Sequence, residues 1–449
     1  MHQRGSAKLP NHEYSIGSIF TAIQLYITGG VSFHACSRII ACFQDRLPEF
    51  SRVPTNNSIQ SWVLRLGLFQ LTLAKERADD WVVILDHTCQ LGNQKCLVVL
   101  GIRLSHWRTL GRPLAFRDMT VLMIRVIERS TGLIVQSQLR ELQAEIGNIA
   151  AILSDQGSDL VNGAKLFSQS VAEEPPLFDV DQVALPGAAK PLVLKDFSHA
   201  SSHILKSHLE ADPRWQEFIS ECGKTHPKVK QILLGAIAPP TQKVKGRYMN
   251  IGDIICWGVK MLDLLAGTRG KLPKKTNRSL LRAKYGWLEK FNESLRQWNE
   301  LNQLREESLQ LIRVLGYSDQ AVDAIRTKLS AYSSYTSSQS MADDLLELAR
   351  SQTALIGPGL SYPGSSEIIE SLIGKTKQLQ GQHSRGGFTK MVLTIGTCLS
   401  EISEEVVWQA LKTTREIDIR KWTKTALGDT LGSIRRMSLP RTKIASTQN

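Results

Sequence analysis

The sequence predicts an α/β fold: a mixed five-stranded sheet with flanking helices, interrupted by a large all-helical insertion and preceded by a small helical unit. Three adjacent apolar runs begin after residue 80, which indicates strands joined by hairpins. Two later runs alternate with helical patterns, as in the crossovers that add parallel strands to a sheet. From residue 211 to residue 355 no strand pattern remains, so we expect helices alone in that segment.

Composition and charge narrow the class of protein. The chain has 449 residues, 42% of them hydrophobic and 22% charged, which is typical of a globular protein with several domains and not of a disordered chain. Its formal net charge is +13. A surplus of this size favours a polyanionic partner, DNA or RNA first, although a basic enzyme of another kind would show a similar charge.

Several classes of protein are disfavoured. The seven cysteines are scattered without a Cys-x-x-Cys pair, which argues against a zinc knuckle or a disulfide framework and for a reducing compartment. No run of 18 apolar residues predicts a membrane span. Residues 1–11 are polar and do not resemble a signal peptide. We therefore expect a cytoplasmic protein that does not enter a membrane.

Residues 1–75 are expected to form three short helices. The first covers about 18–27, the second begins after Ser32, and the third begins after the capping residue Thr55 and closes at Gly67. Such a unit suits a helix-turn-helix, whose last helix enters the DNA major groove. The polar face of that helix would then contact DNA, with Gln60 and Arg65 as the expected contacts; the alternative is a helical dimerisation cap.

Turn residues and periodicity place the remaining elements. The dipeptide Gly92-Asn93 predicts the turn of a hairpin. Strands are expected at residues 82–85, 96–104, 121–128, 149–153 and 192–195. Helices are expected at residues 132–146, 157–168, 198–209, 281–315, 318–329, 365–377 and 404–412, with loops at 270–275 and 333–340.

Two of the expected strands end in an aspartate. The run WVVILDHT reaches Asp86, and the run IAAILSDQGSD reaches Asp155. A carboxylate at the end of a buried strand lies at the edge of the sheet, where ligands and metals bind in open sheets. Two of them on neighbouring strands could share divalent cations. Asp159 is a competitor one turn into the following helix, and Asp155 could also serve as a helix cap.

The runs LDHTCQLGNQKCLVVLG, LSDQGSDL and LKDFSHASSHILK, in this order, resemble DDE transposases of bacterial insertion sequences. The resemblance implies an RNase H-like catalytic core in residues 76–210, completed by an acidic helix in 356–400. The segment 211–355 would be the helical insertion, residues 1–75 the DNA-binding helix-turn-helix, and residues 401–449 a helical, basic tail.

The resemblance also implies a third acid on a late helix. Glu370 is the first candidate, because family members often carry a basic residue seven positions later, and Lys377 stands there. Seven residues make two helical turns, so both side chains share one face, with Lys377 near DNA phosphate. Glu289 is the alternative third acid. Asp196 is expected as a helix cap or supporting acid, and His199 as a DNA or carboxylate contact.

The implied function is metal-dependent cleavage at transposon ends, followed by strand transfer into target DNA. The resemblance implies two Mg²⁺ ions, replaceable by Mn²⁺, held by Asp86, Asp155 and Glu370. It implies a homodimer in the synaptic complex with terminal-repeat and target DNA, in a bacterial, nucleoid-associated setting. Two alternatives stay open: a catalytically inactive DNA-binding protein derived from a transposase, and an RNase H-like nuclease or resolvase that cuts without joining.

Overall fold

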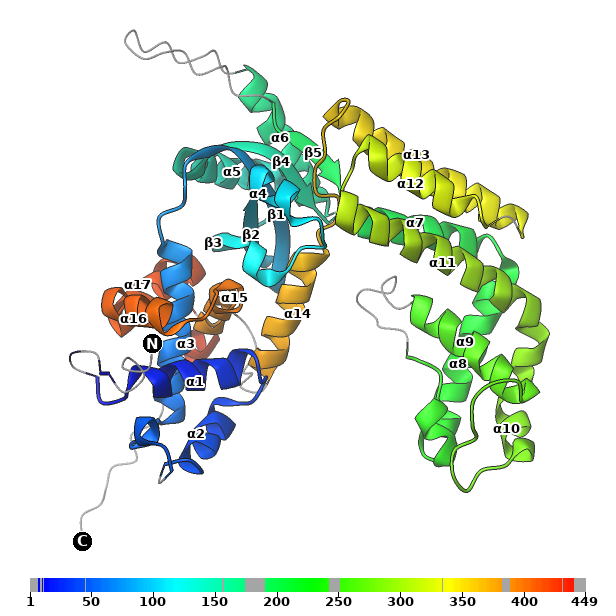
Figure 1. Ribbon diagram of the computed structural model, residues 1–449, viewed down its shortest axis with the longest axis horizontal. Coiled ribbons are helices and arrows are strands. Elements are labelled where there is room, and N and C mark those ends of the chain that lie inside the picture. Colours follow the sequence, from blue (N-terminus) through cyan, green and yellow to red (C-terminus); the bar gives the residue numbers. More distant parts are fainter. Residues whose placement is uncertain are drawn as a thin grey trace. The chain divides into compact units, whose positions relative to one another are not determined.

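The chain folds as two compact units (Figure 1). The first comprises Met1–Leu194 and Ser366–Asn449, and the second comprises Lys195–Ser365. The computed structural model describes residues 7–8, 10, 12–44, 46–155, 157–173, 190–241, 251–332, 334–381, 388–429 and 431–439. The breaks between the units fall at 194/195 and 365/366, whereas the sequence predicts the insertion at 211–355; the finer five-part division stays a prediction.

A five-stranded mixed sheet forms the centre of the first unit. The strands are β1 (Ala78–Leu91), β2 (Gln94–Arg103), β3 (Thr120–Ile127), β4 (Gly147–Ser154) and β5 (Leu192–Lys195). They lie in the order β3-β2-β1-β4-β5. Strands β1, β2 and β3 are antiparallel neighbours, and β4 runs parallel to β1. This is the order of an RNase H-like sheet, and the fold class that the sequence predicts is confirmed.

Strand β1 is longer than its apolar run predicts. Its pairing with β4 stops at Leu85, but its hairpin with β2 continues to Leu91, past a bulge after His87. Asp86 therefore lies within β1, at the point where the parallel pairing ends, and not at the end of the strand. The expected turn at Gly92-Asn93 is present, with Gly92 at φ 59°.

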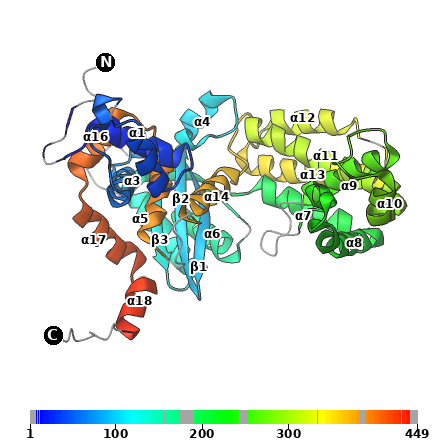
Figure 2. The same cartoon turned by 90° about the horizontal axis from the view of Figure 1, so that it is seen from below.

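The alternation of side chains along β1 separates the two faces of the sheet. Trp81, Val83 and Leu85 belong to a core with helices α5 (Gly132–Ile146) and α6 (Ser158–Glu173). The residues between them face the opposite side, because successive strand residues point to opposite faces. Helix α14 (Glu367–Gly381) packs against β1 (Figure 2).

The second and third N-terminal helices begin where the sequence predicts, and the first begins slightly earlier, at Ile16. Helices α1 (Ile16–Ile27), α2 (Phe33–Ala41) and α3 (Asn56–Thr72) are capped by the side chains of Ser15, Ser32 and Thr55, respectively. The expected end of the third helix at Gly67 is wrong. A Cβ atom at Gly67 would lie 2.0 Å from the Leu393 carbonyl oxygen, so this glycine permits a close helix crossing and α3 continues to Thr72.

The N-terminal helices pack against the C-terminal ones. Helix α3 contacts α15, α16 and α17, and α1 contacts α16. The remaining helices of this unit are α4 (Leu104–Leu110), α15 (Thr394–Leu399), α16 (Glu404–Thr413), α17 (Glu416–Leu427) and α18 (Leu431–Ser438), with short 3₁₀ turns at Pro48–Phe50, Phe116–Asp118 and Lys390–Leu393. Residues 1–75 thus share a core with residues close to the other end of the chain.

The second unit is helical in its described part, apart from the end of β5 and an isolated bridge between Tyr317 and Tyr362. Its elements are α7 (Phe197–Glu210), α8 (Pro213–Lys230), η3 (Leu233–Ile237), α9 (Ile251–Ala266), α10 (Arg278–Tyr285), η4 (Gly286–Phe291), α11 (Asn292–Leu315), α12 (Asp319–Leu329) and α13 (Thr336–Ile356). Trp215 and Trp298 are buried with ring centroids 5.0 Å apart, so these tryptophans build the core of this unit.

Two expectations for this unit are wrong in detail. The single helix expected at 281–315 is divided into α10, η4 and α11. The loop expected at 333–340 gives way to α13 at Thr336, because the buried Ser338 and Met341 bring its first turns into the core. Among the residues that the structure describes, no helix has the length and apolar character needed to cross a membrane.

Candidate active site at the edge of the sheet

Asp86 lies on β1, and Asp155 directly follows the neighbouring parallel strand β4. The last register pair of β1 and β4 joins Leu85 to Ser154, and each aspartate is the next residue of its chain. Val83 points into the core with α5 and α6, so Asp86, three positions later on β1, points to the opposite face. Neighbouring strands lie about 4.8 Å apart, which brings carboxylates in this arrangement within reach of a common ligand.

Backbone hydrogen bonds orient both carboxylates. The His87 N–H donates to Asp86 Oδ1 at 2.6 Å, and the Gly157 N–H donates to Asp155 Oδ1 at 3.1 Å. The second bond closes a tight turn between β4 and α6. Asp155 therefore closes the turn before α6, and it follows the strand that pairs with the Asp86 strand. Both residues are partly exposed, as a ligand would require.

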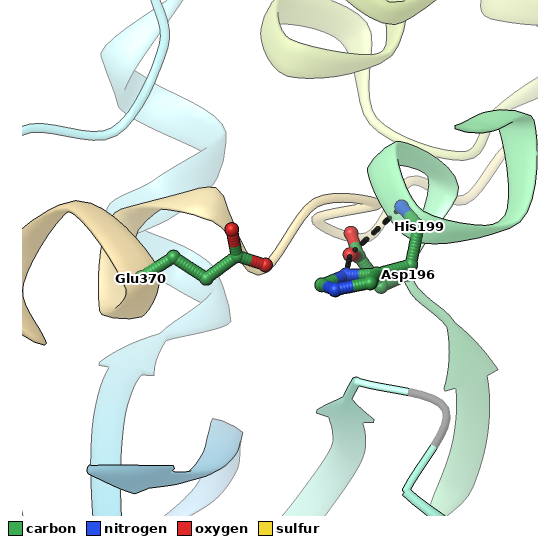
Figure 3. A group of neighbouring side chains, drawn as sticks. All are labelled: Asp196, His199 and Glu370. Atoms are coloured by element: carbon green, nitrogen blue, oxygen red, sulfur yellow. Dashed lines mark hydrogen bonds and ion pairs between the residues drawn. The ribbon is translucent and has the colours of Figure 1, made fainter. Parts of the chain in front are cut away.

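Helix α14 carries the two other expected residues of this site in the same unit. Glu370 and Lys377 are separated by two helical turns, and Figure 3 shows the Glu370 side chain projecting from the helix. Lys377 lines a small cavity of about 50 Å³ together with Thr88, which is two residues after Asp86 and faces the same side. The packing of α14 on β1 thus brings the basic end of this helix face next to the strand that carries Asp86.

Asp159 has a different environment. Its Oδ2 lies 2.7 Å from the Lys95 Nζ and 4.0 Å from the His87 Nε2. Burial would raise the pKa of Asp159, but the hydrogen bonds from Lys95 and Ser130 hold it below its ordinary value. The Asp159 carboxylate is therefore ionised and engaged by a cation of its own chain.

Asp196 and His199 belong to the second unit. The Asp196 carboxylate caps α7 by accepting the backbone N–H groups of Ser198 and His199 at 3.3 and 3.2 Å. It also lies 2.6 Å from His199 Nδ1 (Figure 3). The cap accounts for an aspartate directly after β5; a supporting role for this pair in catalysis stays a prediction.

Glu289, the alternative third acid, is an exposed residue of η4 in the second unit. Its upstream neighbour Tyr285 is buried and donates to the Ile237 carbonyl at 3.1 Å, so the tyrosine serves the helical core. Of the two candidate glutamates, only Glu370 belongs to the unit that contains Asp86 and Asp155.

Gln60 and Arg65 contact the chain's own C-terminal part. The Arg65 Nε donates to the Thr414 carbonyl at 2.5 Å, its second terminal nitrogen bonds the Leu411 carbonyl, and Gln60 Nε2 lies 3.3 Å from Met391 Sδ. The polar face expected to read DNA is thus packed inside the unit. A DNA contact by either residue stays a prediction that requires these helices to separate.

Sequence reasoning did not identify Lys95, Ser130 or His87 as neighbours of the candidate site. Lys95 could have been found from the sequence, because it is a polar residue at the start of an apolar strand. The turn at Gly92-Asn93 fixes the register of the hairpin, and that register places Lys95 near His87. Of the expected basic tail, Arg441 and Lys443 lie outside the described residues.

No protein-family model matches the chain, and no curated protein matches its sequence. Among solved structures, the chain is similar to the Drosophila P element transposase strand transfer complex, with a TM-score of 0.39 and 12% sequence identity, over 92% of this chain and 94% of that chain.

Proposed function

We propose that this protein is a DNA transposase of the bacterial insertion-sequence type, which cleaves transposon ends and joins them to target DNA by a DDE mechanism. The observation that supports the proposal is that Asp86 and Asp155 each directly follow the last register pair of β1 and β4, Leu85 with Ser154, in an RNase H-like sheet. Helix α14, which bears Glu370, packs against the same strand. The sequence resemblance assigns acids to these three positions.

The donor chemistry of these three carboxylates suits a divalent metal. Carboxylate oxygens are the hard donors that Mg²⁺ and Mn²⁺ prefer, and Asp86, Asp155 and Glu370 would hold two such ions. When bound, the ions supply positive charge that stabilises the phosphoryl oxygens during displacement.

The chain's own residues orient the acids and bind DNA. The His87 and Gly157 N–H groups fix the rotation of Asp86 and Asp155, so the carboxylates are arranged before a metal binds. Lys377, beside Thr88, is placed to contact a DNA phosphate next to the site. The net charge of +13 supports binding to DNA as a whole. A homodimer would bring two terminal repeats together in the cytoplasm.

Four single substitutions test this proposal. Asp86→Asn, Asp155→Asn and Glu370→Gln remove one charge each with little change in shape, and Glu289→Gln is the matched control. The substrate is linear duplex from the DNA that flanks the gene, with supercoiled plasmid as target and Mg²⁺ or Mn²⁺ present. Cleavage and joining should fall by more than about a hundredfold in the first three variants and stay within about twofold in Glu289→Gln.

The possible products separate the alternatives. Joined DNA that depends on all three acids supports the transposase. Cleaved but unjoined DNA would identify a nuclease or resolvase, and DNA binding without any metal-dependent cleavage would identify an inactive DNA-binding protein. Wild-type joining by Asp86→Asn would refute the site itself.

A further inference from the structure

A polar cluster lies close to the turn that carries Asp155. Lys95 of β2 and Asp159 of α6 form an ion pair at 2.7 Å, with side-chain exposures of 29% and 12%. His87 Nε2 lies 4.0 Å from the same Asp159 oxygen and 3.4 Å from the Ser130 hydroxyl. Because this pair is mostly shielded from water, it is better held than an exposed surface ion pair.

The ion pair connects the two chain segments that carry Asp86 and Asp155. Lys95 belongs to the hairpin formed by β1 and β2, and Asp86 lies on β1 of that hairpin. Asp159 follows Asp155 by four residues and lies at the start of α6. A Cβ atom at Gly157 would lie 2.9 Å from Asp155 Oδ1 and 3.3 Å from Asp159 Oδ1, so the two carboxylates enclose this glycine. A displacement of Asp159 is therefore transmitted to Asp155 through a very short turn.

We propose that Lys95 and Asp159 are positioning residues: their ion pair ties the turn after β4 to the β1–β2 hairpin and so holds Asp155 against Asp86 in the geometry that a divalent metal needs. This inference rests on the proposed function. Metal sites tolerate displacements of only about 0.5 Å in their ligands, so a link between the two supporting segments acts directly on affinity. The same pair keeps the Asp159 carboxylate bound to a cation of the chain, so it does not compete with Asp155.

Binding of Mn²⁺ to the full chain, measured by electron paramagnetic resonance, tests the proposal. Asp159→Asn and the double variant Lys95→Met/Asp159→Asn should both raise the Kd for Mn²⁺ about tenfold. Lys95→Arg, which keeps the charge and its donors, should stay within about twofold of the wild type. The double variant is decisive, because it removes both charges together. If the two residues affected Mn²⁺ binding only through the net charge near the site, the double variant would bind Mn²⁺ like the wild type, because it leaves that net charge unchanged. This result would overturn the positioning role.

A second ion pair on the same sheet provides the control. Arg125 of β3 and Glu141 of α5 lie 2.5 Å apart, with side chains 42% and 49% exposed. Arg125→Met/Glu141→Gln should leave the Kd unchanged, and thermal unfolding of all variants shows whether they are folded to the same extent. If the proposed function is wrong, the result is different: Asp86→Asn binds Mn²⁺ with the Kd of the wild type. That result would refute both the proposed function and the positioning role.

Discussion

The Asp155 carboxylate accepts the Gly157 N–H at the turn that precedes α6, and Asp155 follows the strand that pairs with the Asp86 strand. The first feature is local and structural, and the second belongs to the proposed metal site. At the scale of single residues these two contributions can be separated, because asparagine closes the same kind of turn as aspartate but lacks the charge.

We therefore compare Asp155→Asn with Asp155→Ala. The alanine variant should lose about 0.5–1.5 kcal/mol of stability, the usual net contribution of one hydrogen bond, whereas the asparagine variant should stay close to the wild type. Mn²⁺ binding should be lost in both. Denaturant unfolding and metal titration measure the two effects, and an asparagine variant that still binds Mn²⁺ normally would remove Asp155 from the site.

At the scale of elements, the crossing of α3 and α15 depends on two glycines in direct contact. A Cβ at Gly67 would meet the Leu393 carbonyl oxygen at 2.0 Å, and a Cβ at Gly396 would meet the Gly67 carbonyl oxygen at 2.5 Å. Both obstacles are backbone atoms, so a side chain at either position forces the helices apart. This crossing joins the N-terminal helices to the C-terminal ones.

Gly67→Ala should consequently destabilise the protein by about 1–3 kcal/mol, the usual cost of overpacking a close contact. Gly374→Ala in α14 is the matched control, because a Cβ there meets nothing within 4 Å. Alanine in an open helical position should instead stabilise the protein by about 0.4–1 kcal/mol. Thermal unfolding of both variants provides the comparison, and a Gly67→Ala protein as stable as the wild type would contradict the close crossing.

At the scale of the whole molecule, the two units differ in how they begin and end. The second unit brings its own ends together: the Phe197 N–H donates to the Gly364 carbonyl at 2.8 Å, and the Lys195 N–H donates to the Gln352 side chain at 2.9 Å. The first unit is made of two chain segments that share one core. Residues 1–75 are part of this core through the contacts of α3.

We predict that the first unit still folds when the second unit is removed, but does not fold when residues 1–75 are removed. Replacing residues 195–365 by a short Gly-Ser linker should leave a folded first unit that binds Mn²⁺ through Asp86 and Asp155. Deleting residues 1–75 should give an insoluble or unfolded protein, because it exposes the apolar surface that α3 covers. Circular dichroism and Mn²⁺ titration of the purified proteins measure both outcomes; a well-folded deletion of residues 1–75 would show an independent N-terminal domain.

Local signals in the sequence were sufficient for the strands and for several helix starts. Thr55 caps α3 as expected, and the Gly92-Asn93 turn lies between β1 and β2. These features depend on a few neighbouring residues, whose hydrogen bonds form within one turn of chain. The prediction that α3 ends at Gly67 was wrong because it used only local sequence. A glycine that ends a helix and a glycine that permits a close helix crossing cannot be distinguished until the partner helix is known.

The sequence by itself determined the class of fold, the order of its strands and the position of Asp86 and Asp155 at the ends of apolar runs, because side-chain periodicity and turn chemistry are local. Only the tertiary structure decided that these two residues follow paired positions of β1 and β4, that Glu370 belongs to their unit and Glu289 does not, and that Arg65 bonds carbonyls of the C-terminal helices. Those outcomes depend on pairing and packing between segments up to hundreds of residues apart, which no local pattern encodes.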